Sequence, residues 1–203
     1  MERLRDRLER RLDEARRTWS LLDGAFLDLV ERAAALAVET LRGGGGLYFL
    51  GNGGSAADAQ HWAAELVGRY LEERRPLNAH ALTVNASTTT ALVNDYPPEE
   101  VFERQVRAHV RPGDLVVCIS TSGRSENVLR AARAARERGA RVLGVTGEGG
   151  GGLADLCDLC VRAPSRDTPR IQEVHLLFGH LFCEAIEQAF LETAPAKTGE
   201  TPA

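Results

Sequence analysis

The sequence predicts an α/β fold in which a parallel sheet is covered by helices on both faces, giving three layers. Short, almost continuous apolar runs such as LVVCIS alternate with longer stretches of helical periodicity, which is the pattern of a parallel sheet buried on both sides. Clusters of glycine stand at the ends of these apolar runs. The chain has 203 residues, enough for one domain with a full core and too few for two independent domains.

The first 42 residues predict a long helix. Apolar residues recur from Leu4 through Leu8 and Leu12 to Ala33 at a spacing of three to four, as in an amphipathic helix. The first half, MERLRDRLERRLDEARR, is so highly charged that its apolar face is a narrow stripe. A narrow stripe suits packing against a partner subunit, so we expect this helix to serve in oligomerisation.

The rest of the chain alternates predicted strands and helices. The expected strands are 47–50, 79–84, 114–120, 141–146 and 159–163, and the expected helices are 55–70, 87–93, 99–110, 125–138 and 169–191. Pro169 stands in the first turn of the last helix, where proline is tolerated. Residues 1–192 therefore form one predicted domain, and the segment 193–203, rich in Pro, Thr and Ala, is expected to be disordered.

Charge and hydropathy exclude several classes of protein. Lys and Arg number 25 against 29 Asp and Glu, a net charge of −4 at pH 7, which argues against nucleic-acid binding through phosphate neutralisation. The apolar runs fall far below the roughly 18 to 20 residues that span a bilayer. The N-terminus is too charged to supply the apolar region of a signal peptide. We therefore expect a cytoplasmic protein that binds neither nucleic acid nor membrane.

The cysteines allow a metal-binding, a redox or a structural interpretation. Cys157 and Cys160 form a single CxxC, whereas a tetrahedral zinc site needs a second pair of ligands at similar spacing. Cys118 and Cys183 lie in separate apolar segments. A redox CxxC would open a helix, whereas DLCDLCVRAP is typical of a short alternating strand. We interpret all four as buried thiols in a reducing compartment.

Two strand-to-helix corners are candidate ligand sites. The first is LGNGGSAAD at residues 50–58, where glycines let the backbone approach a ligand closely. Ser55 is placed to cap the next helix, whose free N–H groups favour an anion. The segment is neither GxGxxG nor a P-loop, so nucleotide binding is not indicated. A plain glycine-rich turn explains this corner equally well.

The second corner is ISTSGRSEN at residues 119–127. Ser120, Thr121, Ser122 and Ser125 surround one turn, and Ser125 can also cap the following helix. Hydroxyl and backbone N–H groups together match the oxygens of a phosphate monoester. Capping and turn formation account for one or two of these hydroxyls but not for all four. Because open α/β sheets bind ligands at the carboxyl ends of their strands, the two corners predict a site for a small phosphorylated metabolite.

Polar side chains also line two predicted helices. His61, Glu65 and Arg69 follow one another at intervals of four and share one helix face. Gln172 and His180 share a face of the last helix. The His and Glu of the first helix could bind a divalent ion together with the Gln and His of the second. Spacing alone favours the plainer interpretation, in which Glu65 and Arg69 form an ion pair and His180 is a core histidine.

Asn94 and Asp95 interrupt the apolar run TTTALVNDYPP. They could simply start the turn that Pro97 and Pro98 demand. An amide and a carboxylate at this position could equally bind sugar hydroxyls. The residues themselves leave both interpretations open.

Four motifs taken together resemble a known family. GNGGSAADAQHWAAELVGRY, ALVNDY, ISTSGRSENV and RIQEVHLLFGH stand in the order found in the SIS (sugar isomerase) family and resemble its phosphoheptose isomerase group, over nearly the whole chain. The resemblance implies a flavodoxin-like SIS domain and a homotetramer whose active sites draw on more than one subunit. It implies that the substrate-binding residues are Asn52, Gly53, Gly54, Ser55, Glu65, Arg69, Asn94, Asp95, Ser120, Thr121, Ser122, Ser125 and Gln172.

The resemblance also implies a cofactor and a reaction. One Zn²⁺ per subunit would be held by His61, Glu65, Gln172 and His180, against the plainer interpretation from spacing. The implied reaction converts sedoheptulose 7-phosphate, a phosphorylated seven-carbon sugar, into D-glycero-D-manno-heptose 7-phosphate through an enediol, with Glu65 as candidate base and His180 as candidate acid. Zinc could polarise the carbonyl, although a carboxylate that binds metal tightly is a weaker base. Some members carry an acidic residue where this chain has Pro169, so no catalytic role is carried over to that position.

A rival function shares these motifs. The DnaA initiator-associating protein is a similar SIS tetramer that binds the replication initiator without catalysis, and it resembles the same four metal ligands. Asp58 and the complete phosphate loop favour the enzyme. A sugar-phosphate sensor of the SIS type usually adds a DNA-binding domain, and we expect none here because the single predicted domain fills the chain.

Overall fold

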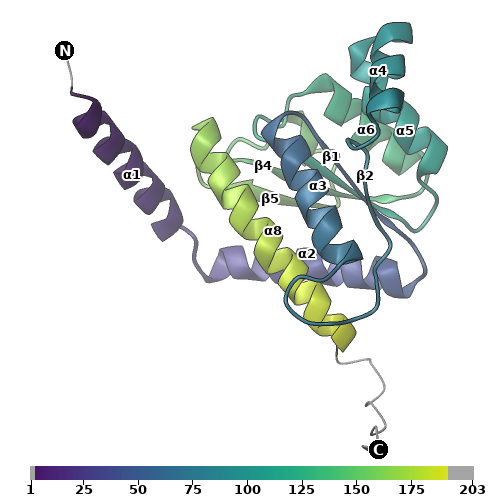
Figure 1. Cartoon of the computed structure of the whole chain (residues 1–203), viewed down its shortest axis with the longest axis horizontal. Helices are drawn as coiled ribbons and strands as arrows, with labels where there is room; N and C mark the ends of the chain where they lie inside the picture. Colours follow the sequence, from purple (N-terminus) through teal and green to yellow (C-terminus); the bar gives the residue numbers. More distant parts are fainter. Residues whose placement is uncertain (1–2, 192–203) are drawn as a thin grey trace, which may run out of the picture.

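The fold is an α/β sandwich built on one parallel sheet. The computed structural model describes residues 3–191, and the predicted disorder of 193–203 lies outside that range. The strand order is β2-β1-β3-β4-β5, and every neighbouring pair is parallel (Figure 1). The predicted fold class is therefore confirmed. Within residues 3–191, no helix combines the length and the apolar character that crossing a bilayer requires.

Most predicted elements are present, with shifted boundaries. The strands are β1 (Leu47–Gly51), β2 (Ala79–Ala81), β3 (Leu115–Ser120), β4 (Arg141–Gly147) and β5 (Leu159–Ala163). The helices are α1 (Leu4–Ser20), α2 (Gly24–Arg42), α3 (Gly54–Val67), α4 (Ala86–Asp95), the 3₁₀ turn η1 (Pro98–Glu100), α5 (Val101–His109), α6 (Glu126–Glu137), α7 (Gly151–Ala154) and α8 (Thr168–Leu191). β2 is shorter than predicted because this edge strand pairs with β1 only from Ala79 to Ala81.

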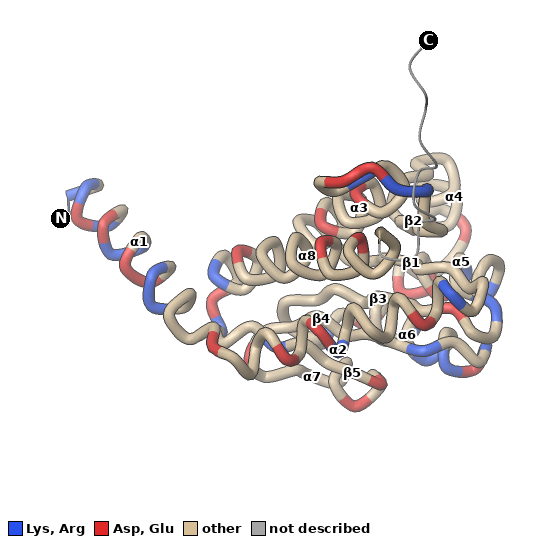
Figure 2. The backbone as a smooth tube through the Cα atoms, turned by 90° about the horizontal axis from the view of Figure 1, so that it is seen from below, with Lys and Arg blue, Asp and Glu red and all other residues tan. Residues whose placement is uncertain are grey.

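The N-terminal segment is two helices, and the prediction of one continuous helix is wrong. The first helix ends at Ser20 with Leu21 as its C-cap residue. Asp23 begins the second, because its carboxylate accepts hydrogen bonds from the N–H groups of Ala25 (3.0 Å) and Phe26 (3.3 Å), as an N-cap residue does. α2 lies along the sheet, whereas α1 extends away from it and carries charges of both signs along its length (Figures 1 and 2). Leu4 and Leu8 on α1 are 71% and 56% exposed.

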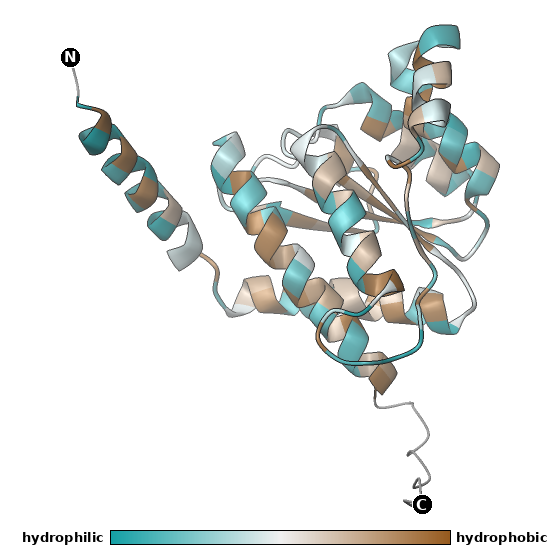
Figure 3. Ribbon diagram, in the orientation of Figure 1, coloured by the Kyte–Doolittle hydropathy of each residue, from teal (hydrophilic) through white to brown (hydrophobic). Residues whose placement is uncertain are grey.

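The sheet is buried on both faces, which explains its apolar strands (Figure 3). Alternate residues of β3 belong to different cores. Val117 packs with residues of α2, α3 and α8, and Val116 packs with residues of α5 and α6. Since successive side chains of a strand point to opposite faces, a strand covered on both sides carries an apolar residue at nearly every position.

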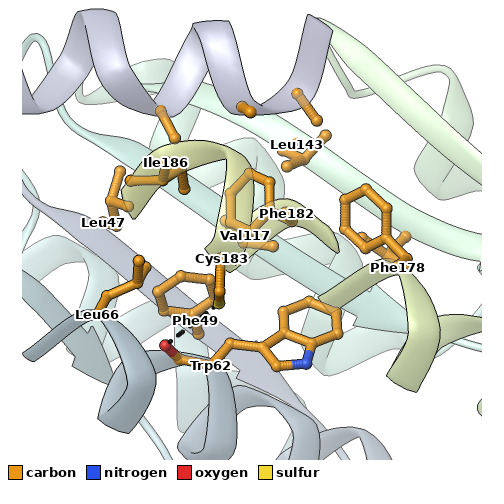
Figure 4. Close-up of a cluster of buried hydrophobic side chains, with 14 of the residues drawn as sticks. Leu47, Phe49, Trp62, Leu66, Val117, Leu143, Phe178, Phe182, Cys183 and Ile186 are labelled. Carbon is orange, nitrogen blue, oxygen red and sulfur yellow. Dashed lines mark hydrogen bonds between the residues drawn. The ribbon is translucent and has the colours of Figure 1, made fainter. Parts of the chain in front are cut away.

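A buried aromatic cluster joins α3 and α8 to the sheet (Figure 4). The Trp62 ring lies edge-on to Phe49 of β1 at 6.2 Å and to Phe178 of α8 at 5.7 Å between ring centroids. Gly179 faces the indole of Trp62 so closely that a Cβ atom would collide with it. The absence of a side chain at Gly179 therefore allows α3 and α8 to approach each other.

His175 of α8 is a buried neutral histidine. It is 1% exposed, and its Nε2 donates to the carbonyl oxygen of Thr146 at 3.1 Å. Its Nδ1 has no hydrogen-bond partner among the described residues. Burial lowers the pKa of His175 to about 4, because the charged imidazolium would lose its hydration.

We expect this histidine to make the fold sensitive to acid. Between pH about 6.5 and 4 the unfolded chain binds a proton at His175 that the folded chain does not, so stability falls as the pH drops through that window and is unaffected above it. The loss should be about 2 kcal/mol at pH 5. Urea unfolding at pH 7 and pH 5 checks this, with His175→Gln as the comparison. An equal pH dependence in the two proteins would contradict the assignment.

Candidate active site

The two predicted corners lie side by side. β1 and β3 are neighbours, and Gly51 pairs with Ile119 at the carboxyl ends of the two strands. From here the chain order runs outward in opposite directions, to β2 on one side and to β4 on the other, which makes this edge the topological switch point where such sheets bind ligands. Asn52 and Asn127 join the corners through two reciprocal amide hydrogen bonds of 2.9 and 2.8 Å. Asn127 was missed from the sequence, although it lies inside the second motif.

The first corner starts α3 without a side-chain cap. Gly53 is the N-cap residue, with φ +54°, and Ser55 lies inside the helix and is buried. The predicted capping role of Ser55 is therefore wrong. A Cβ atom on Gly51 would lie 2.7 Å from the Cβ of Ser55, so this turn needs both a glycine and a small residue where the helix meets the sheet.

The second corner gathers the predicted hydroxyl groups around one turn. The Oγ atoms of Ser120 and Ser125 are 3.3 Å apart, and Ser122 Oγ accepts from the Arg124 N–H at 3.1 Å. Ser125 is the N-cap residue of α6 but its side chain makes no capping bond, so that predicted role is wrong. A cavity of about 390 Å³ borders the turn and is lined by Thr121, Ser122, Arg124, Gly147, Glu148, Gly149, Ser165, Arg166 and Ile171. Arg124 adds a positive charge that sequence reasoning overlooked.

The polar residues of α3 and α8 meet in what we call the α3–α8 seam, formed by His61, Glu65 and His180. His61 Nε2 lies 3.1 Å from Glu65 Oε1, and the rings of His61 and His180 are 5.1 Å apart between centroids. Each histidine stands next to a residue of the contact between Trp62 and Gly179. The close packing of the two helices therefore brings the two imidazoles together.

Arg69 is not part of the helix stripe predicted for it. α3 ends at Val67 and Gly68 is its C-cap residue, so Arg69 lies in the following loop, exposed, with Nη1 donating to the Leu71 carbonyl at 3.1 Å. The partner of Glu65 is His61, not Arg69. The plainer interpretation of an ordinary Glu65–Arg69 ion pair is therefore wrong.

Gln172 and Asp58 lie near the start of α3. Gln172 Nε2 contacts Gly54, and both line a cavity of about 380 Å³ together with Asp58, Pro169, Glu173 and Leu176. Burial raises the pKa of Asp58 to about 6, and the charge of His61 partly opposes this rise. A carboxyl group with a raised pKa in a cavity is a candidate functional group, and sequence reasoning had used Asp58 only to compare families.

The side chains predicted to bind zinc carry donor groups of the types that zinc prefers. Two imidazoles, a carboxylate and an amide oxygen are all groups that zinc accepts, and two imidazoles on one tetrahedral zinc have ring centroids about 5 Å apart. The 5.1 Å between His61 and His180 fits that spacing. In the part of the chain that the structure describes, no three His, Cys, Asp or Glu side chains form a ready-made metal cluster. Gln172, whose Nε2 lies against Gly54, would supply the fourth donor through its amide oxygen.

Asn94 and Asp95 lie apart from the seam. They end α4, are exposed, and share a hydrogen bond of 2.7 Å from Asn94 Nδ2 to Asp95 Oδ1. α4 packs against α5 and η1 and stands at the far side of the molecule from α8 (Figure 1). Within one chain, these two residues do not join the other predicted substrate contacts.

The cysteines follow the prediction only in part. All four are free thiols, and Cys118 and Cys183 are buried as predicted. Cys157 and Cys160 are only half-buried, so the prediction is wrong for this pair. Cys160 lies on β5, an edge strand with β4 on one side only, and Cys157 lies in the loop before that strand.

Comparison with known proteins identifies the family. Residues 12–147 match the SIS domain family. The phosphoheptose isomerase of Rhodospirillum rubrum is 58% identical over 160 residues, covering 79% of this chain and 85% of the relative. The chain belongs to the phosphoheptose isomerase family of SIS-domain proteins. The predicted resemblance is confirmed, and the chain is an isomerase.

Solved structures of phosphoheptose isomerases share the fold throughout. That of Neisseria gonorrhoeae is 40% identical with a TM-score of 0.86, and that of Francisella tularensis is 33% identical with a TM-score of 0.89. Each comparison covers 92% of this chain and 100% of the other. The shared architecture includes the sheet edge and the two helices that carry the α3–α8 seam.

Proposed function

We propose that this chain interconverts sedoheptulose 7-phosphate and D-glycero-D-manno-heptose 7-phosphate. The observation that carries the proposal is the α3–α8 seam, where Glu65 and His180 both lie against His61. His61 and Glu65 belong to α3, the helix that begins at the ligand-binding edge of the sheet. A ketose–aldose shift on a sugar phosphate needs an acid–base pair beside an anion site. The relatives named above are phosphoheptose isomerases, which favours a seven-carbon substrate.

The turn at the second corner, which we call the hydroxyl turn, would hold the phosphate group. Ser120, Thr121, Ser122 and Ser125 offer hydroxyl donors, and Arg124 adds a positive charge next to them. Charge-assisted hydrogen bonds of this kind bind phosphate oxygens strongly. With its phosphate bound in this turn, the substrate would extend its sugar chain toward the α3–α8 seam.

Glu65 and His180 would then move the protons. Glu65 removes the proton from C1 while an acid protonates the oxygen on C2, which gives the enediol. Returning the proton to C2, with loss of the proton from the oxygen on C1, forms the aldehyde. His180 serves the two oxygens because an imidazole ring has both a nitrogen that can donate a proton and one that can accept it.

We further propose that His61, Glu65, Gln172 and His180 hold one Zn²⁺ per subunit. When bound, zinc would polarise the substrate carbonyl as a Lewis acid. The kinds of donor and the spacing of the two imidazoles support this set. Glu65 and His180 would each have two roles, so their ability to move protons should depend on how tightly they bind the ion.

The active unit proposed here is a homotetramer in the cytoplasm, where a charged sugar phosphate would be retained. The exposed apolar stripe of α1, with Leu4, Leu8 and Leu12 at least half exposed, supports packing of α1 on a second subunit. The position of Asn94 and Asp95 away from the seam supports a site completed by a neighbour, in which this pair binds sugar hydroxyls of the substrate held by another subunit.

The stripe on α1 can be tested directly. Leu8→Glu should lower the oligomer mass measured by light scattering, because a charge in an apolar interface is costly to desolvate. Arg7→Gln changes the net charge by the same amount on an exposed position of the same helix and should leave the mass unchanged. An unaltered mass for Leu8→Glu would argue against an interface formed by α1.

The experiment that tests the function is incubation with sedoheptulose 7-phosphate, with and without added zinc, followed by product analysis. We expect turnover that falls after chelation and recovers with zinc. No turnover in either condition, together with a measurable complex with a DnaA initiator, would favour the interaction protein. Turnover that is unaffected by complete removal of metal would contradict the zinc proposal and leave the isomerase standing.

A further inference from the structure

A buried ion pair next to the α3–α8 seam has no part in the chemistry described above. The side chains of Arg74 and Glu187 are each 1% exposed, with Nε and Oε2 3.5 Å apart. Burying two charges costs free energy unless many hydrogen bonds satisfy both groups. Arg74 lies in the loop after α3, and Glu187 lies on α8, two helical turns beyond His180.

The Glu187 carboxylate accepts hydrogen bonds from three successive backbone N–H groups of that loop. Oε2 accepts from Tyr70 at 2.8 Å, and Oε1 accepts from Leu71 at 2.7 Å and from Glu72 at 2.8 Å. Burial raises the pKa of Glu187, but the three N–H donors and Arg74 outweigh it, and the net result is a lowered pKa. The carboxylate therefore stays charged and keeps its hydrogen bonds to the loop backbone.

The Arg74 guanidinium holds the same segment through its carbonyl groups. Nη1 donates to Gly68 at 2.8 Å and to Arg75 at 3.1 Å, and Nη2 donates to the carbonyl oxygen of Glu65 at 2.7 Å. The Glu65 carbonyl belongs to the last turn of α3, whose free carbonyls need donors. One ion pair thus fixes the loop and the backbone of the proposed base.

The loop in turn contacts the proposed acid. The ring of Tyr70 lies against the ring of His180, with centroids 5.8 Å apart and an interplanar angle of 31°. The N–H of this same residue is one of the three that bind Glu187. A continuous series of contacts therefore runs from Glu187 through the Tyr70 backbone and ring to His180.

We propose that Glu187 and Arg74 are positioning residues for the isomerisation. They hold residues 68–75 so that Tyr70 orients the His180 ring while the last turn of α3 keeps Glu65 in place. The inference rests on the proposed roles of Glu65 and His180. The plain alternative is that the ion pair only stabilises the fold, and it predicts that variants at these positions lose stability without a specific change at the seam.

The kinetic test uses Glu187→Gln, Tyr70→Ala and the double variant at a temperature where all are folded. Each single variant should lower kcat by between about tenfold and 10²-fold with KM changed much less, since misplacing a catalytic group has this size of effect. The double variant should be no worse than the worse single variant, because both act through one contact. Effects that multiply, or an unchanged kcat, would overturn the proposal.

Two control variants separate positioning from stability. Ile186→Val alters a fully buried neighbour on α8 and should lower the melting temperature while kcat stays the same. Tyr70→Phe keeps the ring and should stay within about twofold of the wild type if packing on His180 is what matters. Arg74→Lys retains the charge but replaces two donor nitrogens, which reach the carbonyls of Gly68, Arg75 and Glu65, by a single one. If Glu187→Gln does not fold, Arg74→Lys should show the same loss of kcat.

A readout independent of turnover completes the test. In protein with ¹⁵N-labelled histidine, the ring signals of His180, assigned with His180→Gln, should shift in Glu187→Gln and not in Ile186→Val. Unchanged His180 signals would overturn the positioning role whatever the activity. A wild-type chain without turnover whose His180 signals still shift in Glu187→Gln would refute the proposed function alone.

Discussion

Glu65→Gln should abolish isomerisation while the protein still binds phosphate. The amide has nearly the same shape as the carboxylate and can keep the contact with His61, where the Glu65 oxygen lies 3.1 Å from Nε2, but it cannot take a proton from C1. General-base catalysis typically contributes about 10² to 10⁴ in rate, so kcat should fall by at least about 10²-fold. The affinity for inorganic phosphate, measured by calorimetry, should be unchanged because the hydroxyl turn belongs to a different corner.

The control for this variant is Glu31→Gln, which removes an exposed carboxylate from α2 and should leave turnover intact. The zinc content of each protein should be measured alongside. An active Glu65→Gln enzyme would refute the assignment of the base. If excess zinc fully restored the turnover of Glu65→Gln, Glu65 would instead be a metal ligand without a role as base.

Gly123→Ala should disrupt the phosphate-binding turn. Gly123 has φ +62°, and a Cβ atom there would collide with the backbone carbonyl of Gly150. The φ value alone costs a residue other than glycine about 1–3 kcal/mol, and relieving the collision requires the segment at Gly150 to move. Because Gly123 O also accepts from the Leu153 N–H at 3.0 Å, that movement would alter both sides of the cavity.

We expect Gly123→Ala to lower the melting temperature and to weaken phosphate binding by at least about tenfold, which corresponds to about 1.4 kcal/mol. Gly152→Ala is the matched control, close to Gly150 but outside the lining of the cavity. A Cβ atom at Gly152 meets only the Leu129 side chain, at an ordinary contact distance of 3.7 Å, and its φ is not positive. Wild-type phosphate affinity in folded Gly123→Ala would show that the turn does not bind the phosphate.

The layers of the fold could be predicted because they depend on local periodicity. A strand covered on both faces is apolar at nearly every position, and β3 shows this from Leu115 to Ile119. The break between α1 and α2 was missed because the apolar spacing continues through it. α1 ends at Ser20, and the carboxylate of Asp23, which accepts hydrogen bonds from two N–H groups, starts a separate helix.

The hydroxyl turn could also be predicted, since its four hydroxyls lie within one short segment. The capping roles of Ser55 and Ser125 could not. Ser125 is the N-cap residue of α6, but its Oγ lies against Ser120 Oγ and makes no capping bond. For Ser55, a capping bond depends on where the helix begins to within one residue. α3 begins at Gly54, which places Ser55 inside the helix. Arg69 was misplaced for the same reason at the other end of α3, where the helix stops at Val67.

The sequence by itself determined the three-layer fold, the family and the position of both corners, since these follow from short motifs and from spacing along single elements. The tertiary structure decided which polar residues meet. Helical spacing places His61 and Glu65 on one face, but it does not say what that face contacts. The packing of Trp62 on Gly179 brings His180 to them, and the buried Glu187 holds the loop beside them, because contacts between distant segments depend on how helices pack and not on their periodicity.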